Sequence, residues 1–125
     1  MTAPVLIKRA YEPAADSDGY RVLVDRLWPR GLSKASLPYD RWEKTLAPST
    51  DLRKWFGHQV ERWEQFRRDY TAELQSADAL SLMDEILAAA QGQTITLLYG
   101  AHDTEHNQAV VLADMLARRR AAANS

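Results

Sequence analysis

A run of charged residues around a Trp-Pro turn, VDRLWPRGLSK at residues 24–34, contains the side chains best suited to hold an anion. Arg26, Arg30 and Lys34 supply three cations within this short stretch. Arginine binds phosphate or carboxylate through its planar guanidinium, and lysine acts as a compact point charge. Gly31 lets a backbone approach a ligand closely or adopt a positive φ. We therefore predict ligand-binding roles for all four of these residues.

An acid and two aromatic residues accompany these cations. We predict that Asp25 acts as an acid/base group or as an orienting partner, and that Trp28 and Tyr99 form apolar or stacking walls of the site. A structural interpretation stays open beside this one. Charged residues at the end of a buried strand need partners, so Asp25 and Arg26 could pair with buried neighbours while Trp28 fills the core.

A second cluster, STDLRKWFGH at residues 49–58, combines cations with two aromatic residues. An anion could lie at the N-terminus of a helix that starts here, and we predict a ligand-binding role for Arg53, which Lys54 follows in sequence. His58 is a candidate for proton transfer, because histidine is the side chain that titrates near neutral pH. In the alternative interpretation the two aromatic residues belong to the core and Arg53 is a surface charge.

A third cluster, HDTEHN at residues 102–107, places two histidines four residues apart with acids between them. The zinc-protease pattern needs Glu directly after the first histidine, and Asp103 stands there instead. The stretch also passes from a loop into a helix, so His102 and His106 need not share a face. We assign no metal and no cofactor. We predict proton transfer by His106 and ligand binding by Asn107, with a structural role for both as the alternative.

Three apolar runs predict the strands that position these residues: 5–11 (VLIKRAY), 20–27 (YRVLVDRL) and 94–99 (TITLLY). Helical stretches between them favour an α/β fold, a single small layered domain with a short, largely parallel sheet of about three to four strands. Ligands of such sheets bind at the carboxyl ends of the strands, where the first cluster lies. Because the first two strands are close in sequence, an antiparallel hairpin is the alternative pairing.

Apolar residues at helical spacing predict about four to five helices flanking the sheet. The clearest pattern is formed by the apolar residues Trp63, Phe66, Tyr70 and Leu74. Ser49 is the expected N-cap of the second helix and Asp103 that of the last. The predicted helices cover residues 38–46, 50–56, 60–75, 79–90 and 104–121.

Composition narrows the class of protein. The chain has 125 residues, which predicts one domain over residues 1–120 followed by a flexible tail at 121–125. It contains no cysteine, which excludes thiol catalysis and is compatible with the cytoplasmic location that we expect. We find no signal peptide and no apolar run that could span a membrane. The net charge of −1 disfavours a general nucleic-acid binder.

Four motifs in this order resemble the YeaO-like family (domain of unknown function 488). They are RVLVDRLWPRGLSK, APSTDLRKWFGH, WEQFRRDYTAEL and TLLYGAHDTEHNQAVVL, and the resemblance covers residues 7–116. It implies a compact α/β domain of bacterial or archaeal type, without an established activity. The positions that match these motifs are Asp25, Arg26, Trp28, Pro29, Arg30, Gly31, Ser49, Arg53, Trp55, Phe56, His58, Tyr70, Glu73, Tyr99, His106 and Asn107.

Longer relatives in this family carry an Asp-Val-Arg motif at the end of a strand and a Cys-His-Arg motif at the last helix. Here the first motif corresponds to VDR at residues 24–26, whereas EHN at residues 105–107 replaces the second. Since the cysteine is missing, a thiol-dependent role of those relatives does not transfer to this chain.

The leading hypothesis is a small enzyme or a ligand-binding domain that recognises an anionic small molecule or a nucleotide phosphate. One alternative is a nucleic-acid-binding module, in which cations contact phosphates and tryptophans stack on bases. The other is a protein-interaction domain that uses Trp42, Trp55 or Trp63 as a hot spot. The sequence leaves the reaction and the oligomeric state open.

Overall fold

The computed structural model describes residues 3–123 and contains a four-stranded sheet in which all neighbouring strands run parallel. The strand order is β1-β4-β2-β3, so the last strand of the sequence lies between the first two. The predicted parallel α/β fold is therefore confirmed, and the hairpin alternative is wrong. The strands are β1 (Val5–Arg9), β2 (Tyr20–Leu23), β3 (Arg41–Trp42) and β4 (Ile95–Tyr99).

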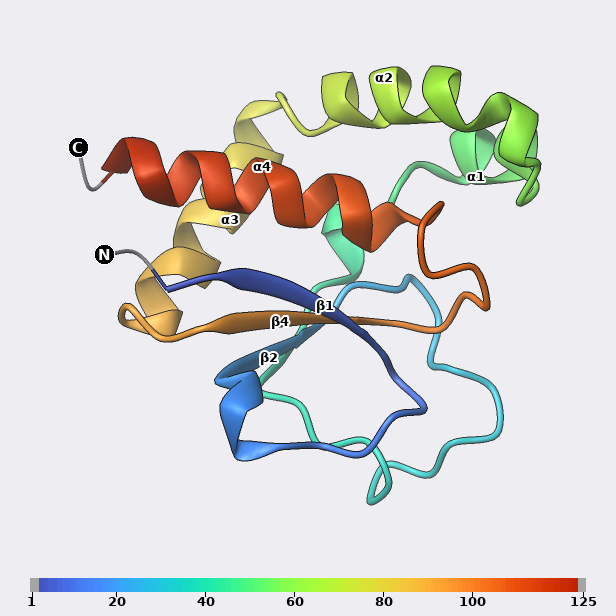
Figure 1. Ribbon diagram of the computed structural model, residues 1–125. Coiled ribbons are helices and arrows are strands. Elements are labelled where there is room, and N and C mark those ends of the chain that lie inside the picture. The colour runs from blue at the N-terminus through green and yellow to red at the C-terminus, as the bar shows by residue number, and fades with distance from the viewer. Residues whose placement is uncertain (1–2, 124–125) are drawn as a thin grey trace.

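The α-helices lie together on one side of this sheet (Figure 1). Three short 3-10 helices lie between these elements: Asp16–Asp18 between β1 and β2, Lys44–Leu46 between β3 and α1, and Val60–Arg62 between α1 and α2. None of the helices among residues 3–123 is long and apolar enough to cross a membrane. The α-helices are α1 (Thr50–Phe56), α2 (Trp63–Glu73), α3 (Ala77–Ala90) and α4 (Gln108–Ala123).

The main core fills the space between the helices and the sheet. All five residues of β4 are buried, because this strand has a neighbour on each edge and cover on both faces. Ile95 and Leu97 face the helices, where Phe66, Tyr70 and Leu112 pack in the same cluster. The predicted strands and the apolar faces of the predicted helices therefore pack against each other, as expected.

The opposite face of the sheet is covered by a loop rather than by a helix. Leu23 and Leu98 point to this side, since side chains alternate along a strand, and they pack against Leu37. Trp28 and Trp42 complete this second cluster at an edge-to-face distance of 5.5 Å between ring centroids. The loop after β2 thus has a structural task in addition to any role in binding.

The helix predicted over residues 38–46 is wrong. Its centre forms β3, in which Arg41 and Trp42 pair with Val22 and Leu23 of β2. The backbone N–H groups on either side of β3 also donate to carbonyls of β2, at 2.8 Å each. Hydrogen bonding to a neighbouring strand has therefore outweighed the local helical preference. The strands predicted over residues 5–11 and 20–27 end earlier in the structure, at Arg9 and Leu23.

The last helix begins at Gln108, four residues later than predicted. Asp103 does accept hydrogen bonds from two following backbone N–H groups, at 2.9 and 3.0 Å, but these close a turn. Asn107 is the true cap, because its side-chain oxygen accepts from the N–H three residues further on at 3.2 Å. Residues 121–123 belong to α4, while the end of the predicted tail, 124–125, lies outside the described residues.

Candidate functional site

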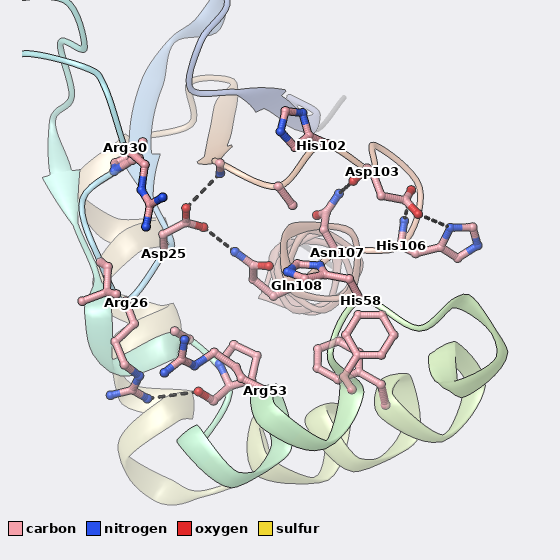
Figure 2. A pocket seen from close by; sticks show the side chains of 18 of the residues that line it. Asp25, Arg26, Arg30, Arg53, His58, His102, Asp103, His106, Asn107 and Gln108 are labelled. Atoms are coloured by element: carbon pink, nitrogen blue, oxygen red, sulfur yellow. Dashed lines mark hydrogen bonds and ion pairs between the residues drawn. The ribbon is translucent and has the colours of Figure 1, made fainter.

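A pocket of about 960 Å³ opens at the C-terminal ends of β2 and β4, between α1 and the first turn of α4 (Figure 2). This is the edge at which parallel sheets bind their ligands. Three segments that are far apart in the sequence contribute its walls. The lining includes residues 25–30, 47–48, 53–54, 56, 58, 66, 100–103 and 106–108, together with Tyr11.

Asp25 lies in the middle of these walls, with its carboxylate held by two donors (Figure 2). The backbone N–H of Gly100 donates to one oxygen at 2.9 Å, and the side-chain amide of Gln108 donates to the other. Burial raises the pKa of Asp25 to about 6 from 3.8, although the bonds from Gly100 and Gln108 and the charge of Arg53 oppose this shift. Asp25 therefore joins the ends of β2, β4 and α4.

Four cations line the pocket around this carboxylate: Arg26, Arg30, Arg53 and Lys54. No carboxylate among residues 3–123 forms an ion pair with any of them. Arg26 donates from Nη2 to the carbonyl of Pro48 at 3.1 Å, and its buried Nε has no acceptor among the described residues. The wall thus holds four positive charges that form no ion pair with the described carboxylates, and Asp25 lies among them.

All three histidines of the chain line the same pocket. His58 directly follows the C-terminal glycine of α1 and has a φ of 58°, a left-handed conformation that a non-glycine residue rarely adopts. His106 contacts Asp103 through Nδ1 at 2.9 Å, and it lies on the far side of Asp103 from Asp25 (Figure 2). The candidate proton-transfer residues therefore share the pocket, but His106 is directed away from Asp25.

The first turn of α4 closes one side of the pocket. Figure 2 shows Asn107 and Gln108 at this end of the helix, with Gln108 turned toward Asp25. Asn107 is buried and caps this helix, and its amide nitrogen also donates to the carbonyl of Asp103 at 2.8 Å. The positive end of the helix dipole consequently adds to the positive potential of the pocket.

Most of the residues predicted for the site do gather there. Three predicted ligand-binding residues do not line the pocket: Gly31, Lys34 and Tyr99. Tyr99 is buried in the core at the end of β4, and Gly31 and Lys34 are exposed on the loop after β2. The predicted residues that do line it are Asp25, Arg26, Trp28, Arg30, Arg53, His58, His106 and Asn107.

The two residues that donate hydrogen bonds to Asp25 were missed from the sequence. Gly100 follows the buried strand β4 just as residues 24–25 follow β2, so its position at the sheet edge was a signal that could have been used. Gln108 carried no such signal, because its role depends on where α4 begins. Trp28 lines the pocket but is also anchored, since its Nε1 donates to the carbonyl of Leu32 at 2.7 Å.

The three central tryptophans lie outside this pocket. Trp42 and Trp63 are partly buried, whereas Trp55 is 40% exposed. The guanidinium of Arg62 lies 5.3 Å from the centre of the Trp55 ring. Of the three tryptophans considered for protein interaction, Trp55 offers the most open surface.

Fold and site together define a class of protein, a small parallel α/β domain with a pocket lined by unpaired cations at its sheet edge. The chain matches the family model described as "Inactive DUF488-N3 subclade" over residues 4–125. It therefore belongs to the YeaO-like DUF488 family, as its four motifs predicted.

The relatives cover nearly the whole chain. The uncharacterised protein YeaO of Escherichia coli (strain K12) is 49% identical over 109 residues, which is 87% of this chain and 93% of that protein. An uncharacterised protein of Mycobacterium tuberculosis (strain ATCC 25618 / H37Rv) is 36% identical over 112 residues, or 90% and 92% of the two chains. No solved structure shows significant similarity to the chain.

Proposed function

We propose that this domain binds an anionic organic molecule, bearing phosphate or carboxylate, in the pocket at the ends of β2 and β4. The observation that carries the proposal is a group of four cations that form no ion pair with a described carboxylate, Arg26, Arg30, Arg53 and Lys54. They gather in one place on a chain whose net charge is −1. Guanidinium groups that are not engaged in an ion pair are suited to hold an external anion.

The size of the pocket supports an organic ligand rather than a bare inorganic ion. Its volume of about 960 Å³ falls within the range of roughly 300–1,000 Å³ that is usual for pockets of small organic molecules. The side chain of Leu27 at its rim is 72% exposed and supplies apolar surface next to the cations. A ligand with a charged group and a larger uncharged part suits this combination.

Four observations favour binding over catalysis. The chain has no cysteine, and the matching family model is described as an inactive subclade. His106 is turned toward Asp103 rather than toward Asp25. Both oxygens of Asp25 already accept hydrogen bonds from the protein. We therefore propose a ligand-binding protein, and its expected cytoplasmic location is part of this proposal.

Phosphate binding by matched variants tests this function. Inorganic phosphate, titrated against the full chain and followed by thermal shift, is expected to raise the melting temperature of the wild-type protein. The Arg53→Ala variant is expected to bind it about tenfold more weakly, since a charge-assisted hydrogen bond contributes roughly 1.5–3 kcal/mol. Arg68→Ala is the control, because Arg68 is exposed on α2 outside the pocket.

If phosphate, sulfate and organic phosphates leave the melting temperature of the wild-type protein unchanged at low salt, the pocket does not bind anions. Equal losses of affinity in the Arg53→Ala and Arg68→Ala variants would also overturn the proposal, because they would reflect the overall charge of the protein rather than this site.

A further inference from the structure

The carboxylate of Asp25 stands within a wall of cations, where it weakens the attraction of the pocket for any ligand that is only an anion. It lines the pocket together with Arg26, Arg30 and Arg53, and the charge of Arg53 acts on it. A site evolved for a bare phosphate or carboxylate would gain nothing from a negative charge in this position. A ligand with a second part that hydrogen-bonds to Asp25 would turn this negative charge to use.

Asp25 retains capacity to accept further hydrogen bonds. A carboxylate offers about four acceptor positions, and the protein occupies one on each oxygen, through Gly100 and through Gln108. The two bonds also fix the carboxylate in a single orientation. A preorganised acceptor of this kind holds a ligand donor at little cost in side-chain entropy.

The charge of the surrounding groups decides which donor suits Asp25. A ligand ammonium group would be attracted by Asp25 but repelled by Arg26, Arg30, Arg53 and Lys54. A hydroxyl group donates a hydrogen bond without carrying charge, so it gains the bond and avoids the repulsion. Neutral hydroxyls next to an anionic group therefore match both features of the pocket.

Resting on the proposed function, we infer that the ligand is the phosphate ester of a hydroxyl-bearing sugar. Its phosphate lies against Arg26, Arg30 and Arg53, and its hydroxyls donate to Asp25. The same division of labour occurs at the strand ends of dinucleotide-binding sheets, where an acidic residue accepts from ribose hydroxyls. The amide of Gln108, beside Asp25, is available as a further hydrogen-bonding group.

Two phosphate esters of similar size test the inference on the wild-type protein. Ribose 5-phosphate carries hydroxyls, whereas pentyl phosphate places the same phosphate on a five-carbon chain without them. Isothermal titration is expected to give at least a tenfold tighter dissociation constant for ribose 5-phosphate, because hydrogen bonds to a charged group are worth about 10–100-fold each. Adenosine 5′-monophosphate, as a third ligand, distinguishes a nucleotide from a free sugar phosphate, and either order of these two supports the inference.

A matched pair of variants assigns the preference to Asp25. Asp25→Asn removes the charge while its amide can still bond Gly100 and Gln108, so the preference for ribose 5-phosphate should fall about tenfold. Asp69→Asn is the control, since Asp69 is exposed on α2 and outside the pocket, and this variant should keep the wild-type preference. Should the Asp25→Asn variant fail to fold, the wild-type comparison of the two esters decides alone.

The two proposals fail in different ways. If inorganic phosphate and both esters do not bind, the proposed function is wrong and the inference is wrong with it. If inorganic phosphate binds, and ribose 5-phosphate and pentyl phosphate bind equally well, the anion site stands and the sugar assignment is overturned. A preference for ribose 5-phosphate that survives in the Asp25→Asn variant would overturn the role of Asp25.

Discussion

Two aspartates flank the strand β2 in sequence, and their surroundings differ in one decisive respect. Asp18 is buried on the sheet face opposite the helices, where it binds Lys8 at 2.8 Å and also bonds Arg21. Asp25, at the other end of β2, has four cations in its pocket and an ion pair with none of them. The charges around Asp18 are paired with one another, whereas the cations around Asp25 form no ion pair with the described carboxylates.

The difference separates charges that hold the fold from charges that are available to a ligand. Burial alone would raise the pKa of Asp18, but hydrogen bonds from Lys8, the N–H of Ala15 and Arg21 outweigh it and lower the pKa. For Asp25 burial prevails and raises the pKa to about 6. Residues of the same types therefore stabilise the fold where each has a partner, and form a candidate site where the partners are missing.

The largest expected effect comes from removing the ion pairs of Asp18. Asp18→Ala leaves the buried guanidinium of Arg21 without its carboxylate, and removal of one partner of a buried pair costs about 3–5 kcal/mol. Urea denaturation should report this loss in the free energy of unfolding. A loss below about 1 kcal/mol would show that the group around Asp18 is not a structural network.

A smaller effect is expected at Asp25, whose contribution to the free energy of unfolding falls, rather than grows, as the pH rises. Its folded pKa of about 6 exceeds the ordinary value of 3.8, so the folded state holds a proton between pH 4 and 6 that the unfolded chain releases. The stabilising contribution of Asp25 is thus fully present below pH 4 and is lost as the pH rises through 6.

The Asp25→Asn variant removes this titration and measures it. From pH 4 to pH 7 the free energy of unfolding of the variant should rise relative to wild type by roughly 1–3 kcal/mol. Urea denaturation at a series of pH values gives the difference directly. A constant difference across this interval would mean that the pKa of Asp25 is not raised in the folded protein.

The smallest effect is expected for the unpaired cations that line the pocket. Arg53 is exposed and forms no ion pair with the described carboxylates, so Arg53→Ala should change the free energy of unfolding by less than about 0.5 kcal/mol. The same urea experiment, without added anion, provides the measurement. A loss comparable to that of Asp18→Ala would make Arg53 a structural residue and remove the contrast between the two groups.

The strands and the core could be predicted from the sequence because buried segments show a strong local pattern of apolar residues. Val22, Leu23 and Val24 form an uninterrupted apolar run, and all three are fully buried. Ser49 predicted the start of α1, and its hydroxyl does accept from the N–H of Leu52 at 3.2 Å. In both cases neighbouring residues alone determine the outcome.

The parts that were not predicted depend on contacts between distant segments. β3 forms because β2 is present to pair with it, although residues 38–46 favour a helix locally. Gln108 enters the site through Asp25, which lies 83 residues earlier in the chain. Lys34 was predicted beside Arg30 on sequence proximity, yet the loop carries it away from the pocket. Such pairings have no signal within one segment.

The central position of β4 also has a consequence for the order in which the protein is made. β1 and β2 both take their backbone partners from residues 95–99, and neither pairs with the other. A ribosome that has released only the first 94 residues has therefore produced two apolar strands without the strand that joins them. The sheet is completed during the synthesis of the last quarter of the chain, and the pocket at its edge cannot exist before that point.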